Sequence, residues 1–314
     1  MTATAQPLNG QGVVVLGSVN HDQVHRVHAF PGPGETVLAK ESFEFAGGKG
    51  QAQATAASRF GSPTRLIAAI GDDEAGRLSL RHLDQSGVSL QLVRVLPGVR
   101  SGRAVVMIDA AAENSILVER GANAHLQSLT DSDLAAIAAA RVLLVQLETG
   151  TAAPIAAIQH AAANGTTVVL NAAPVQSLPE AVLRLVDVLI VNEVEVRQLG
   201  GNRPLDAAVQ HLLQWVPSVV VTLGGAGGVL AQRGEPVQRF GTLSVEPVDT
   251  TGAGDACCGV LAAAIEQGMP LAEGLQRALL AGSLAVQSMG CAPSIPDRAA
   301  VDAAHDTYLA ASSK

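Results

Sequence analysis

A glycine-rich segment, Asp249-Thr-Thr-Gly-Ala-Gly-Asp255, has the residue types of a site that binds an anion and accepts a proton. It follows a run at residues 243–248 that is predicted as a strand, and it opens a predicted helix with apolar positions from Cys257 onward. Free backbone N–H groups at a helix start, here those of Gly252 to Asp255, lie at the positive end of the helix dipole. Glycine also lets a phosphate approach the backbone closely. The segment therefore predicts an anion site.

The carboxylate of Asp255 lies at this same helix start. It is suited to take a proton from a hydroxyl group while the amides neutralise charge on a transferred phosphoryl group. In the alternative interpretation, Asp255 only stabilises its own helix and the glycines only form a turn. The spacing alone leaves both interpretations open, and the first predicts phosphoryl transfer to an alcohol.

A second glycine turn, Ala46-Gly-Gly-Lys-Gly50, precedes a helix predicted over residues 51–60. Lys49 is one of only three lysines, and arginine supplies nearly all other positive charge. Because lysine is otherwise avoided, we interpret Lys49 as functional rather than as a solvated surface residue.

Polar residues also follow two predicted strands, which is where the sites of parallel sheets form. Asn20 and Asp22 follow the first strand, and Asn192-Glu-Val-Glu195 ends a later one. Asn192 and Glu195 are able to hold Mg²⁺ through water, since this ion keeps much of its hydration. A helix cap with a solvated glutamate is the alternative.

No segment matches G-x-x-x-x-G-K-[ST] or completes G-x-G-x-x-G, so a nucleotide would bind in another way.

The composition excludes several classes of protein. The chain has 314 residues and a net charge of −8, which gives no basic field for a nucleic acid. No secretory leader and no membrane-spanning run are recognised. Three cysteines are too few for a disulfide framework and lack zinc-site spacing, so a cytoplasmic location is expected.

Short apolar runs alternate with helical patterns along the chain, which predicts a doubly wound, mostly parallel α/β sheet flanked by helices. The strands are predicted at residues 13–17, 65–71, 142–147, 167–172, 188–192 and 218–224. Two stretches break this rhythm and predict a small second β-sheet, a lid. We therefore expect a core of residues 12–19, 46–98 and 121–306, a lid of residues 20–45 and 99–120, and flexible tails at residues 1–11 and 307–314.

These segments together resemble ribokinases and the wider carbohydrate kinase family, colinearly from Val13 to about Pro296. The matching pieces are Gly17-Ser-Val-Asn-His-Asp22, Phe30-Pro-Gly-Pro-Gly-Glu-Thr36, Ala46-Gly-Gly-Lys-Gly50, Gly71-Asp-Asp73, Gly121-Ala-Asn-Ala124, Gln146-Leu-Glu148, Asn192-Glu-Val-Glu195, Thr222-Leu-Gly224 and the segment ending at Asp255. Each piece is weak alone, whereas the ordered series is specific.

The resemblance implies an ATP-dependent kinase that phosphorylates the primary hydroxyl of a pentose, D-ribose to ribose 5-phosphate, in a cleft beneath the lid. Deoxyribose, fructose, a sugar acid and a nucleoside are the alternative substrates. The resemblance also implies Mg²⁺, activation by K⁺ and a homodimer formed through the lid. Two other functions remain as alternatives, a non-catalytic sugar sensor on the same fold and a dinucleotide-dependent oxidoreductase.

The resemblance further implies roles for individual residues. Asp255 corresponds to the base, and the amides of Ala253, Gly254 and Asp255, after Gly252, form the anion hole. The implied sugar contacts are Asn20, Asp22, Gly48, Lys49 and Glu148, together with Asp255 itself. The implied nucleotide contacts are Asn192, Thr222, Gly224, Gly225 and Gly227, with Mg²⁺ near Asn192 and Glu195. The implied K⁺ ligands are oxygens of Asp249, Thr251, Ala285, Ser288, Gly290 and Ser294.

Several positions depart from the family's pattern. Ribokinases read Gly-Gly-Lys-Gly-Ala-Asn-Gln where this chain has Gly47-Gly-Lys-Gly-Gln-Ala-Gln53, so Ala52 stands at the place of a sugar-binding asparagine. Restoring that amide by Ala52→Asn is predicted to improve ribose as a substrate, unless Gln51 or Gln53 fills the gap. Cys257 replaces a large aromatic residue, and Leu279 replaces a polar residue near the adenine, which predicts altered nucleotide binding.

Overall fold

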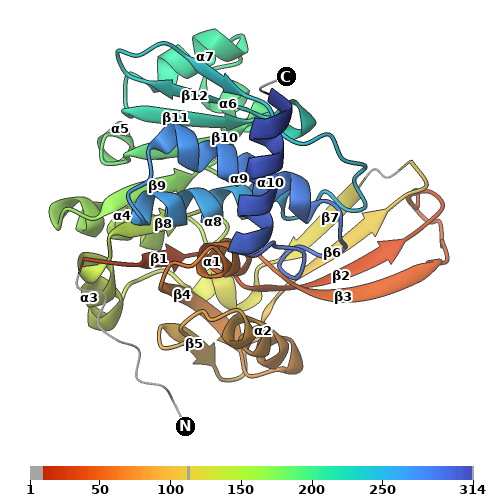
Figure 1. The fold of residues 1–314 in the computed structure, drawn as a ribbon. Coiled ribbons are helices and arrows are strands. Elements are labelled where there is room, and N and C mark those ends of the chain that lie inside the picture. The colour runs from red at the N-terminus through yellow and green to blue at the C-terminus, as the bar shows by residue number, and fades with distance from the viewer. Residues whose placement is uncertain (1–9, 112–113, 313–314) are drawn as a thin grey trace.

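The computed structural model describes residues 10–111 and 114–312, and a nine-stranded sheet dominates this part of the chain (Figure 1). The strand order is β13-β12-β11-β10-β9-β8-β1-β4-β5, parallel except where β12 and β13 run antiparallel at one edge. The strands are β1 (Val13–Leu16), β4 (Thr64–Gly71), β5 (Val93–Leu96), β8 (Val142–Val145), β9 (Thr167–Asn171), β10 (Val188–Asn192), β11 (Ser218–Thr222), β12 (Gly228–Gln232) and β13 (Gln238–Phe240). The predicted doubly wound, mostly parallel sheet is confirmed.

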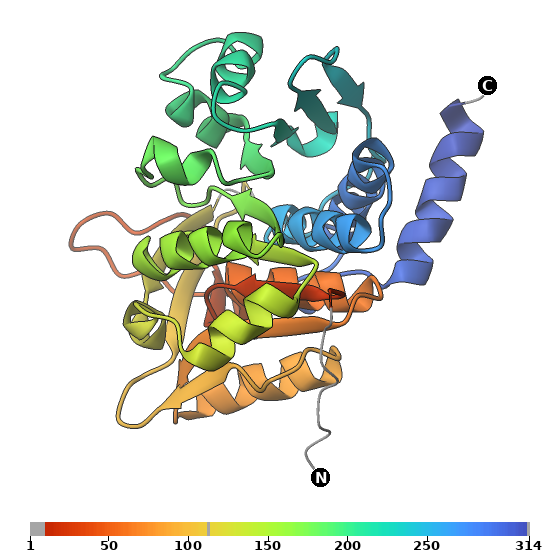
Figure 2. The same cartoon turned by 90° about the vertical axis from the view of Figure 1, so that its left-hand side faces the viewer.

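Helices cover both faces of this sheet, and alternate residues of each central strand point into two separate cores. In β1, Val14 and Leu16 belong to the core cluster that also contains residues of α3, α4, α6 and α7, whereas Val13 and Val15 belong to the cluster that contains residues of α1, α2, α8, α9 and α10. All four side chains are fully buried, which explains why the strand is an unbroken apolar run. Figure 2 shows α10 as the outermost helix, beside α9.

The helices have the following bounds. They are α1 (Lys49–Arg59), α2 (Glu74–Gln85), α3 (Asp131–Ala139), α4 (Ala152–Ala163), α5 (Glu180–Leu183), α6 (Glu193–Leu199), α7 (Leu205–Leu212), α8 (Ala253–Glu266), α9 (Leu271–Ala285) and α10 (Arg298–Ser312), with the 3-10 turns η1 (Gly121–His125) and η2 (Gly224–Ala226).

A second sheet extends from one side of this core, as the sequence predicts (Figure 1). Its strands are β2 (Asn20–Arg26), β3 (Glu41–Gly47), β6 (Gly102–Ile108) and β7 (Asn114–Glu119), in the order β3-β2-β6-β7. The central pair β2–β6 is parallel and the outer pairs are antiparallel. The turn predicted between the last two strands lies partly outside the described residues, at residues 112–113.

Two expectations about regular structure are wrong. Residues 243–248 form no strand, because the segment instead runs along α9, where the Val248 N–H donates to the Val286 carbonyl. Its alternating apolar residues therefore reflect packing on a helix rather than pairing in a sheet. Residues 307–312, expected to be a flexible tail, continue α10, whereas residues 1–9 and 313–314 lie outside the described residues.

No helix in the described part of the chain is long and apolar enough to span a membrane.

Candidate active site

The start of α8 presents free backbone N–H groups, as the glycine segment predicts. Gly252 caps the helix with a φ of +86°, and a Cβ at this position would lie 2.8 Å from the Cys291 carbonyl oxygen. The first helical bond runs from Ala256 N to Gly252 O at 2.8 Å, and Ala253 N makes a long 3.4 Å bond to the Thr250 carbonyl. Within the described residues, the amides of Gly254 and Asp255 have no acceptor. These two N–H groups are therefore available to an anion.

The Asp255 carboxylate is buried at this helix start, with a residue exposure of 7%. Its Oδ1 accepts a hydrogen bond from Gln53 Nε2 at 2.8 Å, and the one hydrogen-bond donor to its Oδ2 among the described residues is the Cys291 thiol, with Sγ at 3.8 Å. The carboxylates of Asp255 and then Glu148 raise the pKa of Lys49, so this lysine is charged beside the Asp255 carboxylate. A carboxylate, an ammonium group and free amides thus converge on one point.

A cavity of about 400 Å³ opens at that point. It joins residues from both glycine segments to residues at the carboxyl ends of β9, β10 and β11. Its lining includes Lys49, Asn171, Asn192, Glu195, Thr222, Thr250, Gly252, Gly254, Asp255 and Cys258.

Asn192 and Glu195 form a capping box at the start of α6, which is the helix-cap alternative. Asn192 Oδ1 accepts from the N–H groups of Val194 and Glu195, and Glu195 Oε2 accepts from Asn192 N at 2.8 Å. Both residues also line the cavity, and burial raises the pKa of Glu195. Capping therefore orients these side chains at the cavity wall.

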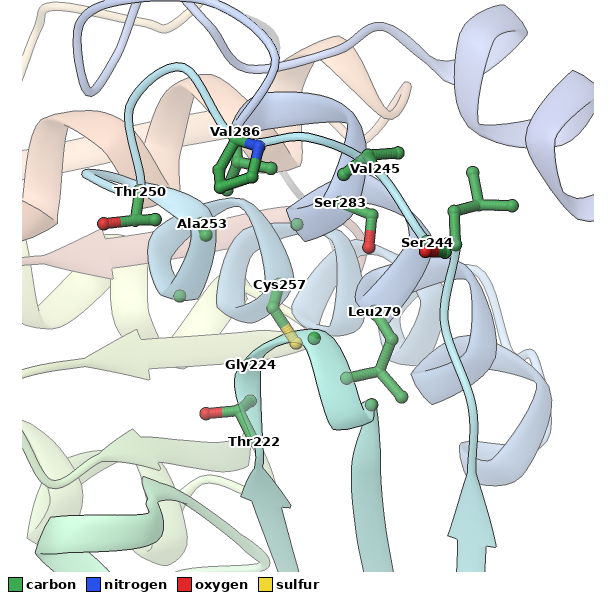
Figure 3. Close-up of a pocket in the computed structure, with 16 residues that line it drawn as sticks. Thr222, Gly224, Ser244, Val245, Thr250, Ala253, Cys257, Leu279, Ser283 and Val286 are labelled. Atoms are coloured by element: carbon green, nitrogen blue, oxygen red, sulfur yellow. The ribbon is translucent and has the colours of Figure 1, made fainter. Parts of the chain in front are cut away.

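A second cavity of about 420 Å³ adjoins the first, and Thr222, Thr250 and Gly254 line both. It lies between the end of β11, the extended segment at residues 243–247 and helices α8 and α9 (Figure 3). Gly224, Gly225, Gly227 and Ala253 line it as well. Cys257 and Leu279 supply apolar surface from α8 and α9, at two of the positions that depart from the family's pattern. The shape suits an elongated ligand whose end reaches Asp255.

Among the residues implied as sugar contacts, Asn20 and Asp22 are buried, whereas Gly48, Lys49 and Glu148 are partly buried. Asn20 Oδ1 accepts from Asn123 Nδ2 at 2.9 Å, and Glu148 Oε2 accepts from the Ser18 hydroxyl and from Lys49 N. Gly48 has a φ of +87°, and a Cβ there would lie 2.7 Å from Asn20 N, so glycine is required for this close approach. These contacts hold acceptor oxygens in fixed positions.

The Asp22 carboxyl group is 6% exposed, and its Oδ1 has no partner within the described residues. Burial, and then the carboxylates of Glu148, Asp255 and Asp249, raise the pKa of Asp22 from 3.8 to about 7. A buried acceptor without a partner indicates a ligand that brings a hydroxyl group.

Asp22→Asn is expected to raise the Tm more at pH 8 than at pH 5. Asp22 has a pKa of about 7 in the folded chain but an ordinary pKa of 3.8 in the unfolded chain, so between these pH values the folded chain binds a proton that the unfolded chain does not. The contribution of this group to stability is therefore greatest below about pH 4 and is lost as the pH rises through about 7. The full penalty is roughly 4 kcal/mol at 1.36 kcal/mol per pKa unit, and an amide avoids it. Thermal melts at the two pH values measure the effect, and an equal Tm difference at both would contradict it.

The residues implied as K⁺ ligands are partly brought together. The buried Asp249 carboxylate accepts from Thr251 N at 2.9 Å and from Gly290 N at 3.0 Å, which ties the loop before α8 to the loop after α9. Ala285 O already accepts from Ser288 N, and the Ser294 hydroxyl donates to the Cys291 carbonyl. Within the described residues, no three His, Cys, Asp or Glu side chains are grouped to hold a metal ion.

Three buried polar residues at the site were not assigned a role from the sequence. Gln53 contacts Asp255 rather than filling a gap beside Ala52, and Asn171 and Gln146 contact Gln53. Ala52 itself is fully buried in an apolar cluster with Cys291 and Ala292. In the sequence, the Gln146-Leu-Glu148 motif marked one of these positions and the glycine segment ending at Gln53 marked another, whereas no motif marked Asn171.

Comparisons with known proteins agree with this arrangement. The sequence model of the pfkB family of carbohydrate kinases matches residues 11–298. The ribokinase of Haemophilus influenzae is 34% identical over 295 residues, 91% of this chain and 95% of the relative. The deoxyribokinase of Salmonella typhi is 31% identical over 294 residues, 90% of this chain and 95% of the relative.

Among solved structures, Arabidopsis thaliana ribokinase complexed with ribose and ATP matches with a TM-score of 0.86 and 33% identity. The match covers 93% of this chain and 98% of that chain. The resemblance seen in the motifs is thereby confirmed, and it extends over the core and the lid alike. The chain therefore belongs to the pfkB family of carbohydrate kinases.

Proposed function

We propose that this protein transfers the γ-phosphoryl group of ATP to the primary hydroxyl of D-ribose and releases ADP and ribose 5-phosphate. The observation that carries the proposal is the meeting of the two cavities at the start of α8, where Asp255 and the free amides lie. Family membership and the ribokinase relatives support the same reaction. The sensor alternative would not require a buried carboxylate beside free amides at this point.

In this proposal the nucleotide lies in the larger cavity along Thr222, Gly224, Gly225 and Gly227, with its terminal phosphate at Gly254. Asp255 Oδ2 takes the proton of the sugar hydroxyl as the new O–P bond forms and the bond from the γ-phosphorus to the bridging oxygen breaks. The N–H groups of Gly254 and Asp255 stabilise charge on the transferred group. The other sugar hydroxyls are held by Lys49, Asn20, Asp22, Glu148 and the Gly48 turn.

Mg²⁺ fits the proposal at Asn192 and Glu195. Glu195 Oε2 bonds only the Asn192 N–H in the described residues, and the half-buried carboxylate with its raised pKa lines the same cavity as Asp255. Such an oxygen is suited to bind a hydrated Mg²⁺ ion, which would neutralise charge on the phosphates when bound.

K⁺ fits at Asp249. This buried carboxylate is balanced by backbone amides but by no basic side chain in the described part of the chain, and the oxygens around it are hard ligands. A bound cation would order the loop that carries the anion hole.

Asp249→Asn is expected to abolish the stimulation of kcat by K⁺, measured against Na⁺ at constant ionic strength. Retained stimulation would contradict this site.

A homodimer formed through the lid is part of the proposal. The edge strand β7 exposes Ile116 (50%) and Val118 (47%) on one face of the lid sheet and Leu117 (71%) on the other, and a second lid sheet would cover one of these apolar faces. The proposal also includes a cytoplasmic location, where the thiols of Cys257, Cys258 and Cys291 would stay reduced.

A sugar panel tests the function. Protein, ATP, Mg²⁺ and K⁺ are incubated with D-ribose, 2-deoxy-D-ribose, D-fructose, a sugar acid and a nucleoside, and ADP is measured. We expect the highest kcat/KM with ribose, while the apolar cluster around Ala52 makes 2-deoxyribose the second candidate. No sugar-dependent ADP above the ATPase background would refute the proposal.

The same panel tests the predicted effect of Ala52→Asn. The added amide is expected to raise the kcat/KM for ribose relative to 2-deoxyribose, because it would offer a partner to a hydroxyl that deoxyribose lacks. An unchanged ratio would show that this position does not contact the sugar.

A further inference from the structure

The catalytic carboxylate is held by a glutamine from a different helix. Gln53 lies on α1, is fully buried, and donates from Nε2 to Asp255 Oδ1 at 2.8 Å. The two helices pack closely enough that a Cβ on Gly259 of α8 would lie 2.4 Å from the Gln53 carbonyl oxygen. The position of Gln53 relative to the base is therefore fixed by backbone packing as well as by the hydrogen bond.

Neighbouring amides fix the orientation of the Gln53 side chain. An ionised carboxylate only accepts hydrogen bonds, so the amide nitrogen of Gln53 must face Asp255. Gln146, just after β8, donates from Nε2 to Gln53 Oε1 at 2.6 Å. Gln53 Nε2 also donates to Asn171 Oδ1 at 3.1 Å, and Asn171 Nδ2 donates to the Ile190 carbonyl at 3.3 Å. The network leaves Gln53 no alternative amide orientation that keeps all these bonds.

This arrangement treats the two carboxylate oxygens of Asp255 differently. Oδ1 is occupied by Gln53, whereas within residues 10–111 and 114–312 Oδ2 has only the weak donor Cys291 Sγ, at 3.8 Å. A hydrogen bond donated to a carboxylate stabilises its ionised form, which is the form that accepts a proton. Oδ2 is thus the oxygen left for the substrate hydroxyl.

We propose that Gln53 is a positioning residue for the phosphoryl transfer, which binds Oδ1 of Asp255 and turns the carboxylate so that Oδ2 receives the hydroxyl proton. The role rests on the proposed function of Asp255 as base. Gln146 and Asn171 act through Gln53, since the hydrogen bonds place both against its amide. A glutamine kept only for packing would instead affect stability without affecting the proton-transfer step.

Two substitutions of Gln53 test the proposal. Gln53→Met keeps the length of the side chain and removes the donor, and it is expected to lower kcat by about 10- to 100-fold while the KM values for sugar and ATP change less than about threefold. The acidic limb of the kcat–pH profile is expected to move to higher pH. Gln53→Glu places a second carboxylate beside Asp255, so it should move that limb further.

Thr55→Val is the matched control. Thr55 lies on the same helix, is equally buried, and contacts His82 rather than the site. This variant should lower stability without moving the pH limb. A Gln53→Met enzyme with the kcat and pH profile of Thr55→Val would overturn the proposal.

A ¹³C titration of the Asp255 carboxyl group, assigned with Asp255→Asn, separates this proposal from the proposed function. Its midpoint should be higher in Gln53→Met than in the wild type, and an unchanged midpoint would overturn the role of Gln53. If the wild type turned over no sugar, the proposed function would fail, while the titration would still decide whether the hydrogen bond from Gln53 acts on the Asp255 carboxyl group. Should Gln53→Met not fold, Gln53→Glu gives the same two readouts.

Discussion

Asp255→Asn is expected to lower kcat by about 10²- to 10⁴-fold, the range that general base catalysis contributes. The amide oxygen still accepts a hydrogen bond from Gln53, so the side chain should keep its place at the start of α8. What is lost is the group that receives the hydroxyl proton. Steady-state kinetics with ribose and ATP measure the loss.

Sugar binding is the control for this substitution. The implied sugar contacts other than Asp255 come from β2, the α1 turn and the segment after β8, so calorimetry should give a ribose Kd within about threefold of the wild type. A variant with near-normal turnover would refute the assignment of Asp255 as base. A variant that lost ribose binding along with turnover would assign Asp255 mainly to binding.

Gly252→Ala is expected to lower kcat by about 10²-fold, similar to the loss of one anion-hole donor. The φ of +86° costs a non-glycine residue about 1–2 kcal/mol, and the new Cβ would lie 2.8 Å from the Cys291 carbonyl oxygen. Relief of this contact must move the start of α8, and with it the free amides of Gly254 and Asp255.

Gly268→Ala provides the matched control at the other end of α8. Gly268 also has a positive φ, +77°, and its Cβ would meet only Arg141 Nη2 at 3.5 Å. Both substitutions should lower the Tm by a few degrees, but only Gly252→Ala should affect kcat. Equal kcat values in the two variants would show that the geometry of the α8 start does not determine the rate.

The parallel core was predictable because its signal is local. β1 is apolar at every position since helices bury both of its faces, and such a run reports a central strand directly. The edge strand β13, Gln238–Phe240, carries no such signal, because backbone pairing rather than side-chain burial defines it. Residues 243–248 were wrongly predicted as a strand, because their apolar and polar residues alternate as in a strand although the segment is extended and packed on α9.

In the candidate site, too, the residues with a local sequence signal were predictable and those without one were not. Gly252, Gly254 and Asp255 act within one turn of helix, so their roles follow from a short segment and from the chemistry of helix starts. Gln53 lies 202 residues from Asp255 in the sequence, and no local pattern predicts that α1 and α8 bring the two together. The capping box of Asn192 and Glu195 shows that two interpretations of one motif can hold together.

The position of the phosphoryl group on the product tests the proposed chemistry most directly. Wild-type protein is incubated with uniformly ¹³C-labelled ribose, ATP, Mg²⁺ and K⁺, and the product is examined by ¹³C–³¹P correlation spectroscopy. We predict coupling of phosphorus to C5 and C4, as in ribose 5-phosphate. Coupling to C1, or ADP formed without any sugar phosphate, would contradict the transfer of the phosphoryl group to the primary hydroxyl.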